Sequence, residues 1–155
     1  MATSKWGIDL FNKVLVPLDG SEYANKALDT AIELATKYSA SMVLVHIVPA
    51  TSALITGPEV SSAPILLNLS NELDGSGRRI LENGAMKVQA AGIPVTTVLE
   101  HGDIADNIIR IAENENADLI VIGERGLGAI ARFFLGSVAS KVSSHAKCPV
   151  LIVKL

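Results

Sequence analysis

Aromatic residues and concentrated positive charge are both scarce in this sequence. Only 4% of the 155 residues are aromatic although 49% are hydrophobic, so valine, isoleucine, leucine and alanine must build the core. That composition is typical of a parallel sheet covered by helices. The net charge is −3 and the basic residues are scattered, which argues against the positive surface of a nucleic-acid-binding protein.

Cysteines and long hydrophobic runs are scarce as well. The longest apolar runs cover about seven residues, far short of the ~20 that a membrane-spanning helix needs. The one cysteine, Cys148, excludes an internal disulfide and is interpreted as structural, because no neighbour in the sequence would stabilise its thiolate. We therefore expect a cytoplasmic protein that binds neither membrane nor nucleic acid.

Short aliphatic segments alternate with helical patterns along the whole chain. The expected strands cover residues 14–18, 42–48, 95–99, 119–122 and 150–153. Helices are expected after the turn Asp19-Gly20-Ser21, over residues 65–91, after the N-cap Asp103 and around residues 138–142. Glycines 75, 77 and 84 each weaken the long helix by up to ~1 kcal/mol in this interpretation.

This alternation predicts one doubly wound, Rossmann-like α/β domain over residues 1–155. Its five-stranded parallel sheet has the strand order 3-2-1-4-5, with helices on both faces. Residues 1–12 are expected to form a leading arm and residues 50–64 a long loop. Such sheets bind ligands beyond the carboxyl ends of the strands, where the strand order reverses. The expected crevice therefore lies between the loops that begin at Asp19 and at Gly123.

The second of these loops, residues 123–137, reads GERGLGAIARFFLGS. Gly123 and Gly126 would let the backbone approach a ligand closely, because glycine has no Cβ. Gly136-Ser137 begins the last helix, whose free N–H groups and positive dipole end favour an anion. Asp19 could bind a nucleoside hydroxyl or a hydrated Mg²⁺. The spacing Gly-x2-Gly-x9-Gly-Ser after a buried strand favours a phosphate site.

Each of these residues also has a structural interpretation. Asp19 is equally suited to cap the following helix, and any single glycine can simply end a strand or begin a helix. Arg125 could face phosphate or solvent, and Glu124 would repel a polyphosphate unless it points away or meets a metal. The Phe133-Phe134-Leu135 cluster could cover a nucleotide or pack onto the core, and core packing is the commoner outcome.

The segment from Gly123 to Ser137 resembles the nucleotide-binding signature of the universal stress protein family. Four further segments fit the same family: VLVPLDGS at 14–21, VLVHIVP at 43–49, ADLIVIGERG at 117–126 and CPVLIVK at 148–154. The resemblance spans nearly the whole chain from about residue 12. It implies an adenine nucleotide alpha hydrolase-like fold and membership of the ATP-binding branch of the family.

The resemblance also implies roles for individual residues. Pro17 and Asp19 would line the adenosine side, with Asp19 near the ribose or a Mg²⁺ or Mn²⁺ ion, and Ile47 would meet the adenine. The remaining residues that the resemblance implies would contact phosphates and ribose mainly through their backbone: Gly123, Gly126, Gly136, Ser137 and Val138. Arg125 is a further candidate from this chain's own sequence, because its side chain could face phosphate. The ligand would be ATP, with AMP or cyclic AMP as alternatives. A homodimer through the last strand, residues 150–153, is implied too.

Catalysis is less well supported than binding. The sequence has no Gly-Lys-Ser/Thr motif, so it lacks the lysine of a Walker P-loop, and no catalytic base stands out. His46 is interpreted as a hydrogen-bonded core histidine, and His101 and His145 as surface or capping residues too dispersed for a metal site. We hypothesise an ATP-binding regulator whose state is recognised by an unknown protein partner. A slow ATP hydrolase or kinase-like enzyme, and an interaction module with a vestigial pocket, are the alternatives.

Overall fold

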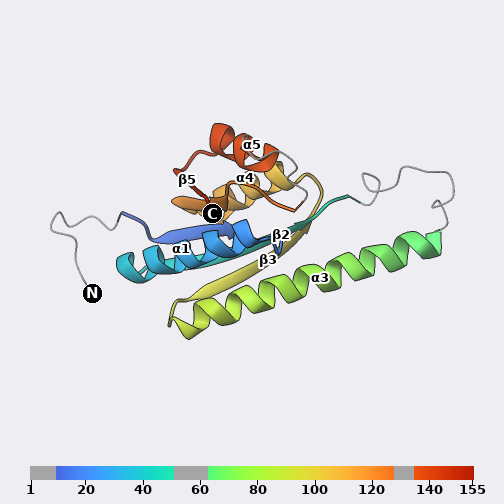
Figure 1. Ribbon diagram of the computed structural model, residues 1–155, viewed down its shortest axis with the longest axis horizontal. Helices are drawn as coiled ribbons and strands as arrows, with labels where there is room; N and C mark the ends of the chain where they lie inside the picture. The colour runs from blue at the N-terminus through green and yellow to red at the C-terminus, as the bar shows by residue number, and fades with distance from the viewer. Residues whose placement is uncertain (1–9, 51–62, 128–134) are drawn as a thin grey trace.

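The fold is built on five parallel strands that lie in the order β3-β2-β1-β4-β5 (Figure 1). The computed structural model describes residues 10–50, 63–127 and 135–155. The strands are β1 (Lys13–Pro17), β2 (Ser41–Val48), β3 (Val95–His101), β4 (Leu119–Gly123) and β5 (Val150–Val153). The helices are α1 (Glu22–Tyr38), α3 (Ala63–Ala90), α4 (Ile104–Asn114) and α5 (Ser137–His145). The strand order and the parallel pairing confirm the predicted fold class.

Two hydrophobic cores lie on opposite faces of the sheet, because successive strand residues point to opposite sides. Along β1, Val14 and Val16 face the core shared with α1 and α3, whereas Leu15 faces the core shared with α4 and α5. Figure 1 shows the same division, with α4 and α5 on one side of the sheet and α1 and α3 on the other. The continuous aliphatic runs of β1 and β4 therefore reflect burial on both faces.

Polar side chains cap the first turns of α1 and α4. The Ser21 hydroxyl accepts a hydrogen bond from the N–H three residues later at 3.1 Å, and Asp103 does the same for α4 at 2.9 Å. The N-cap Asp103 was predicted from the sequence. The alternative interpretation of Asp19 as the N-cap of α1 is wrong, because Ser21 is the N-cap. Gly20, between Asp19 and Ser21, has a φ of +84°, a left-handed conformation that glycine adopts without strain.

Helix α3 packs across β2 and β3, and its N-terminal part extends beyond the sheet (Figure 1). Gly77 and Gly84 allow this packing. A Cβ on Gly77 would lie 2.5 Å from Cδ2 of His46, and a Cβ on Gly84 would lie 2.7 Å from Cδ1 of Leu18. The absence of a Cβ at these two positions thus lets α3 lie close to His46 and Leu18, although the sequence suggested only that the glycines weaken the helix.

Most boundaries lie within one residue of those predicted, and two differ by two residues. Helix α3 begins at Ala63, so residues 63–64 belong to the helix and not to the preceding loop. Strand β3 continues to His101, because its last residues still pair with β2. The rest of the predicted loop and most of the predicted arm lie outside the described residues, so these and the single-domain organisation stay predictions. None of the helices in the described ranges is long and apolar enough to cross a membrane.

Candidate functional site

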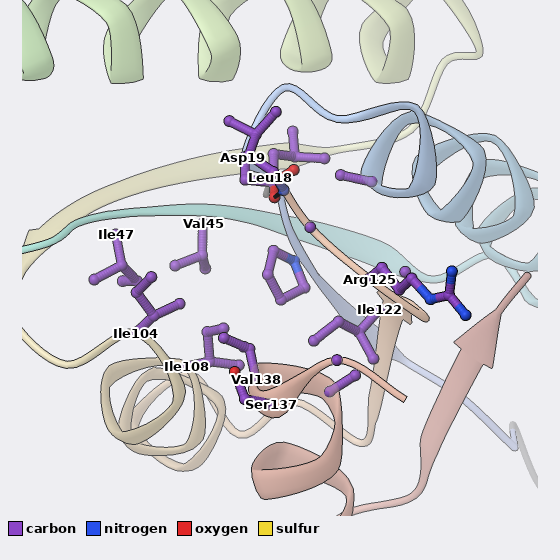
Figure 2. A pocket seen from close by; sticks show the side chains of 17 residues that line it. Leu18, Asp19, Val45, Ile47, Ile104, Ile108, Ile122, Arg125, Ser137 and Val138 are labelled. Atoms are coloured by element: carbon purple, nitrogen blue, oxygen red, sulfur yellow. Dashed lines mark hydrogen bonds between the residues drawn. The ribbon is translucent and has the colours of Figure 1, made fainter. Parts of the chain in front are cut away.

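A cavity of about 260 Å³ opens at the carboxyl ends of β1, β2 and β4 (Figure 2). This volume is near the lower end of the range for small-molecule sites, about 300–1,000 Å³. The structure brings all the sequence-predicted site residues together in its lining: Pro17, Asp19, Ile47, Gly123, Arg125, Gly126, Gly136, Ser137 and Val138. Their role as nucleotide ligands stays a prediction.

One wall of the cavity is aliphatic. Ile47 of β2 faces Ile104 and Ile108, which project from the first turns of α4, and Val45 continues the same surface (Figure 2). The sequence analysis placed the two α4 isoleucines in an apolar stripe but missed their contribution to the site. Their position in a helix that begins directly after β3, at the carboxyl edge of the sheet, was the available signal. The wall is suited to a flat apolar ring.

The backbone of Ile47 adds polar groups to this wall. The N–H of Leu18 donates to the carbonyl of Val45 at 2.7 Å, so the backbone groups of Val45 point toward β1. The carbonyl of Val48 accepts from Gly102 at 3.0 Å, on the β3 side. Because these directions alternate along a strand, the N–H and carbonyl of Ile47 point toward the β1 side, beyond the end of β1. They can pair with the polar edge of a ligand ring.

Asp19 connects the two loops that border the cavity. Its Oδ1 accepts a hydrogen bond from the N–H of Ser21 at 2.9 Å, and its Oδ2 accepts from the N–H of Leu127 at 3.0 Å. The second bond joins residues that are 108 positions apart in the chain. The carboxylate is therefore already engaged on both oxygens by backbone donors.

The three glycines of the predicted signature are all in close contact with the protein itself. A Cβ on Gly123 would lie 2.8 Å from the backbone carbon of Tyr23, in the first turn of α1. A Cβ on Gly126 would overlap Oδ2 of Asp19, and one on Gly136 would lie 3.0 Å from the carbonyl oxygen of Glu124. Contacts with α1, with Asp19 and within the loop itself thus already favour glycine at these positions, independently of any ligand.

The opposite wall of the cavity is the N-terminus of α5. Gly136 is the N-cap and has no side chain to offer, and no side chain elsewhere in the described ranges caps this helix. The first bond inside the helix runs from the N–H of Ser140 to the carbonyl of Gly136. The N–H groups of Ser137, Val138 and Ala139 therefore have no partner within α5. Together with the helix dipole they form an anion-binding surface.

Glu124 contributes through its backbone, whereas Arg125 lines the cavity. The N–H of Glu124 donates to the carbonyl of Val153 at 2.8 Å, and its carbonyl accepts from Gly136 at 2.9 Å, so this residue connects β5 to the start of α5. The side chain of Arg125 lines the cavity edge but extends away from its centre (Figure 2). Of Phe133, Phe134 and Leu135, the two phenylalanines lie outside the described residues.

Helices α4 and α5 are joined beside the cavity by Lys141. Its Nζ lies 2.8 Å from Oδ1 of Asp106 and 3.3 Å from Oδ1 of Asp103. The hydrogen bond from the backbone N–H of Asp106 lowers the pKa of Asp103, and Lys141 adds to this effect. The side chain of Asp106 in turn raises the pKa of Lys141. These ion pairs are exposed and individually weak, but they connect the helices that form the two walls.

The histidines and the cysteine lie where the sequence suggested. Nδ1 of His46 is 2.7 Å from the carbonyl oxygen of Leu18, as expected for a hydrogen-bonded histidine near the core. His101 pairs with Asp74 on α3, and His145 contacts a carbonyl within α5. Burial raises the pKa of the Cys148 thiol, which agrees with a structural role. Across the described residues no three His, Cys, Asp or Glu side chains gather as a metal site.

Comparison with known proteins gives a consistent result. The model of the universal stress protein family matches residues 10–154. Universal stress protein YxiE of Bacillus subtilis is 36% identical over 148 residues, which cover 94% of this chain and 100% of that protein. The solved structure of hypothetical protein MJ0577 superposes with a TM-score of 0.82 at 27% identity, covering 94% of this chain and 97% of that one. A universal stress protein solved in complex with cAMP gives a TM-score of 0.66 at 28% identity, with 93% and 97% of the two chains covered. The chain therefore belongs to the universal stress protein family.

Proposed function

We propose that this universal stress protein binds an adenine nucleotide, ATP in the first place, and acts as a nucleotide-dependent regulator. The observation that carries the proposal is a single cavity with an aliphatic wall on one side and the open N-terminus of α5 on the other. A nucleotide has the same two parts, an apolar ring and an anionic phosphate. The related protein solved with cAMP supports a nucleotide as the ligand class.

The arrangement of the walls suggests how the nucleotide would lie. The base would pack against Ile47, Ile104 and Ile108, with its polar edge at the backbone of Ile47. The phosphates would meet the N–H groups at the start of α5, where the helix dipole favours negative charge. Pro17 and Asp19 would then border the ribose between these two ends.

The hydrogen bonds of Asp19 and the direction of the Arg125 side chain favour regulation over hydrolysis. Asp19 would be the obvious acidic group to activate a water, but both of its oxygens accept backbone hydrogen bonds. Arg125, a possible cation for the transferred phosphate, extends away from the cavity centre. Phosphoryl transfer depends on positioned groups of both kinds. Steady phosphate release from ATP would instead support the slow hydrolase or kinase-like alternative.

The Mg²⁺ or Mn²⁺ ion expected at Asp19 fits the described residues poorly. Mg²⁺ usually keeps several waters and takes its other ligands from one or two carboxylates and the phosphates of a substrate. Within residues 10–50, 63–127 and 135–155, no group of three or more Asp, Glu, His or Cys side chains, with or without Asp19, could hold such an ion by itself. We therefore expect a cation that accompanies ATP to be held by its phosphates.

The regulator hypothesis includes assembly and a partner. Strand β5 is an edge of the sheet, and its Leu151 is 37% exposed. Exposed strand edges pair readily with another strand, so we propose a homodimer through β5. A second protein, unknown from the sequence, would recognise the nucleotide-bound form. The cytoplasmic location predicted from the sequence also stays a prediction.

The most direct test is to identify what the purified protein contains. Mass spectrometry of freshly purified, denatured protein should detect an adenine nucleotide. Calorimetric titration of nucleotide-free protein should then rank ATP, AMP, cyclic AMP and adenosine. A protein that carries no nucleotide and binds none of the four would refute the proposal.

A charge placed at the start of α5 tests the predicted position of the phosphates. Ser137→Asp should stabilise the helix slightly, because a carboxylate favours the positive dipole end. The same carboxylate should repel a phosphate charge about 5 Å away by ~3 kcal/mol at an effective dielectric constant of about 20, or weaken ATP binding by about 100-fold or more. Adenosine affinity should not change.

The matched control is Ser140→Asp, which adds the same charge one turn further along α5, outside the cavity lining. Its effect on ATP affinity should be clearly smaller. Equal losses for both variants, or an equal loss of adenosine binding, would show that the phosphates do not meet the start of α5.

A further inference from the structure

The carboxylate of Asp19 lies in the cavity lining but is used by the protein itself. Both oxygens accept backbone N–H groups, one from its own loop at 2.9 Å and one from Leu127 at 3.0 Å. Hydrogen bonds to an ionised acceptor are about twice as strong as neutral ones. The bond to Leu127 is therefore a substantial connection between the loop after β1 and the loop after β4.

The neighbouring residue shows how close this contact is. A Cβ on Gly126 would overlap Oδ2 of Asp19, so the loop after β4 lies directly against the carboxylate. Two residues earlier, the same loop is anchored by Glu124, whose N–H donates to the carbonyl of Val153 and whose carbonyl accepts from the N–H of Gly136. The bond from Leu127 is thus the anchor on the β1 side of the cavity, and the bonds of Glu124 are the anchors on the β5 and α5 side.

We propose that Asp19 is a positioning residue that fixes the Gly126-Leu127 segment across the cavity, and not the ligand of a metal ion. The inference rests on the proposed nucleotide function, because the segment that Asp19 holds borders the site for the nucleotide. It gives Asp19 a role that the family resemblance did not imply. It also predicts that the importance of Asp19 for nucleotide binding is the same with and without divalent cations.

The protein contains a matched control for this arrangement at the amino ends of β1 and β4, opposite the cavity. Asp118 also accepts two backbone N–H groups, from Asn12 at 2.7 Å and from Lys13 at 3.1 Å. It does not line the cavity. Asp118→Ala therefore removes the same number and kind of hydrogen bonds as Asp19→Ala, away from the candidate site.

The first measurement uses the nucleotide-free protein and follows amide hydrogen exchange of Leu127 by NMR. Asp19→Ala should accelerate this exchange by about tenfold or more, because a hydrogen bond to a charged group is lost. Asp118→Ala should leave it unchanged. Should Asp19→Ala fail to fold, Asp19→Asn keeps the shape and one acceptor, and it should give a smaller acceleration of the same sign.

The second measurement is calorimetric titration of the same variants with AMP and with ATP, each in Mg²⁺ and in EDTA. Asp19→Ala should weaken both nucleotides by a similar factor under both conditions, and Asp118→Ala should weaken neither. A loss confined to Mg²⁺ would identify Asp19 as a metal ligand and overturn the proposal. Weaker binding with unchanged Leu127 exchange would overturn it too, because Asp19 would then contact the nucleotide directly.

The two measurements separate this inference from the proposed function. Faster exchange at Leu127, together with no binding of any nucleotide by the unmodified protein, would refute nucleotide binding and leave the structural connection intact. Unchanged exchange in a protein that binds ATP would refute the connection and leave the function intact.

Discussion

The glycines of α3 offer a quantitative test of how this helix packs on the sheet. Gly75→Ala, Gly77→Ala and Gly84→Ala each add one methyl group inside the helix. Alanine is about 1 kcal/mol more favourable than glycine in a helix interior, and this gain is common to all three sites. The sites differ in the space that the methyl group would find.

At Gly75 and Gly84 the structure gives contrasting surroundings. The nearest atom to a Cβ on Gly75 is Nη1 of Arg79 at 3.6 Å, so the substitution should stabilise the fold by ~0.5–1 kcal/mol. A Cβ on Gly84 would lie 2.7 Å from Cδ1 of Leu18 and 3.1 Å from Cδ1 of Leu44. The ends of these leucines can shift, so overpacking of ~1–2 kcal/mol roughly offsets the helical gain.

Gly77 has the least adaptable neighbours. A Cβ there would lie 2.5 Å from Cδ2 of His46 and 2.8 Å from Cδ1 of Leu99. The imidazole cannot turn away freely, because its Nδ1 is hydrogen-bonded to the carbonyl of Leu18. Overpacking of ~1–3 kcal/mol, together with ~1 kcal/mol for the hydrogen bond that the displaced imidazole loses, exceeds the helical gain of about 1 kcal/mol. The net destabilisation should be ~1–3 kcal/mol.

Urea and thermal denaturation of the three variants provide the assay. For a chain of this size, 1 kcal/mol corresponds to ~2–4 °C in Tm. Gly75→Ala should therefore raise Tm by about 1–4 °C, Gly84→Ala should change it little, and Gly77→Ala should lower it by at least about 2 °C. A Gly77→Ala variant that is as stable as Gly75→Ala would show that α3 does not approach β2 this closely.

Two further predictions concern strand β5 and the cysteine that precedes it. Burial raises the pKa of the Cys148 thiol, so the folded protein keeps this proton where the unfolded chain has lost it. The free energy of unfolding should therefore fall as pH rises above about 8.5. When this free energy is measured by urea denaturation at several pH values, it should fall less steeply with pH in Cys148→Ala; an equally steep fall would contradict the pKa shift. Leu151→Lys on the β5 edge should convert a dimer to monomers in sedimentation equilibrium, whereas Thr97→Lys on the opposite edge should not; identical behaviour of the two variants would argue against β5 as the interface.

The sequence was sufficient for the features that depend on local pattern. Continuous aliphatic runs predicted the buried strands, and Asp103 predicted the start of α4, because burial and capping are properties of a few adjacent residues. The switch crevice followed from strand order, so the loops at Asp19 and Gly123 could be placed together.

Features that depend on contacts between distant segments could not be predicted in this way. The role of Asp19 was not evident locally, because its Oδ2 accepts a hydrogen bond from the N–H of Leu127, a residue far along the chain. Gly77 looked like a weak point in a helix because its requirement comes from His46 on another element. Ile108 was assigned to the core by its spacing, and only the position of α4 shows that it also lines the cavity.

The cavity lies where β1 meets β4, and these strands come from distant parts of the chain. Asp118, directly before β4, bonds to the backbone of Lys13 across a separation of 105 residues. During synthesis, β1, β2 and β3 can assemble with α1 and α3 before β4 has left the ribosome. Pairing over such a separation is slow, because loop closure costs entropy before the contacts form. We therefore expect the cavity to form late in folding, and a ligand that fits it would bind only chains in which β4 has paired with β1.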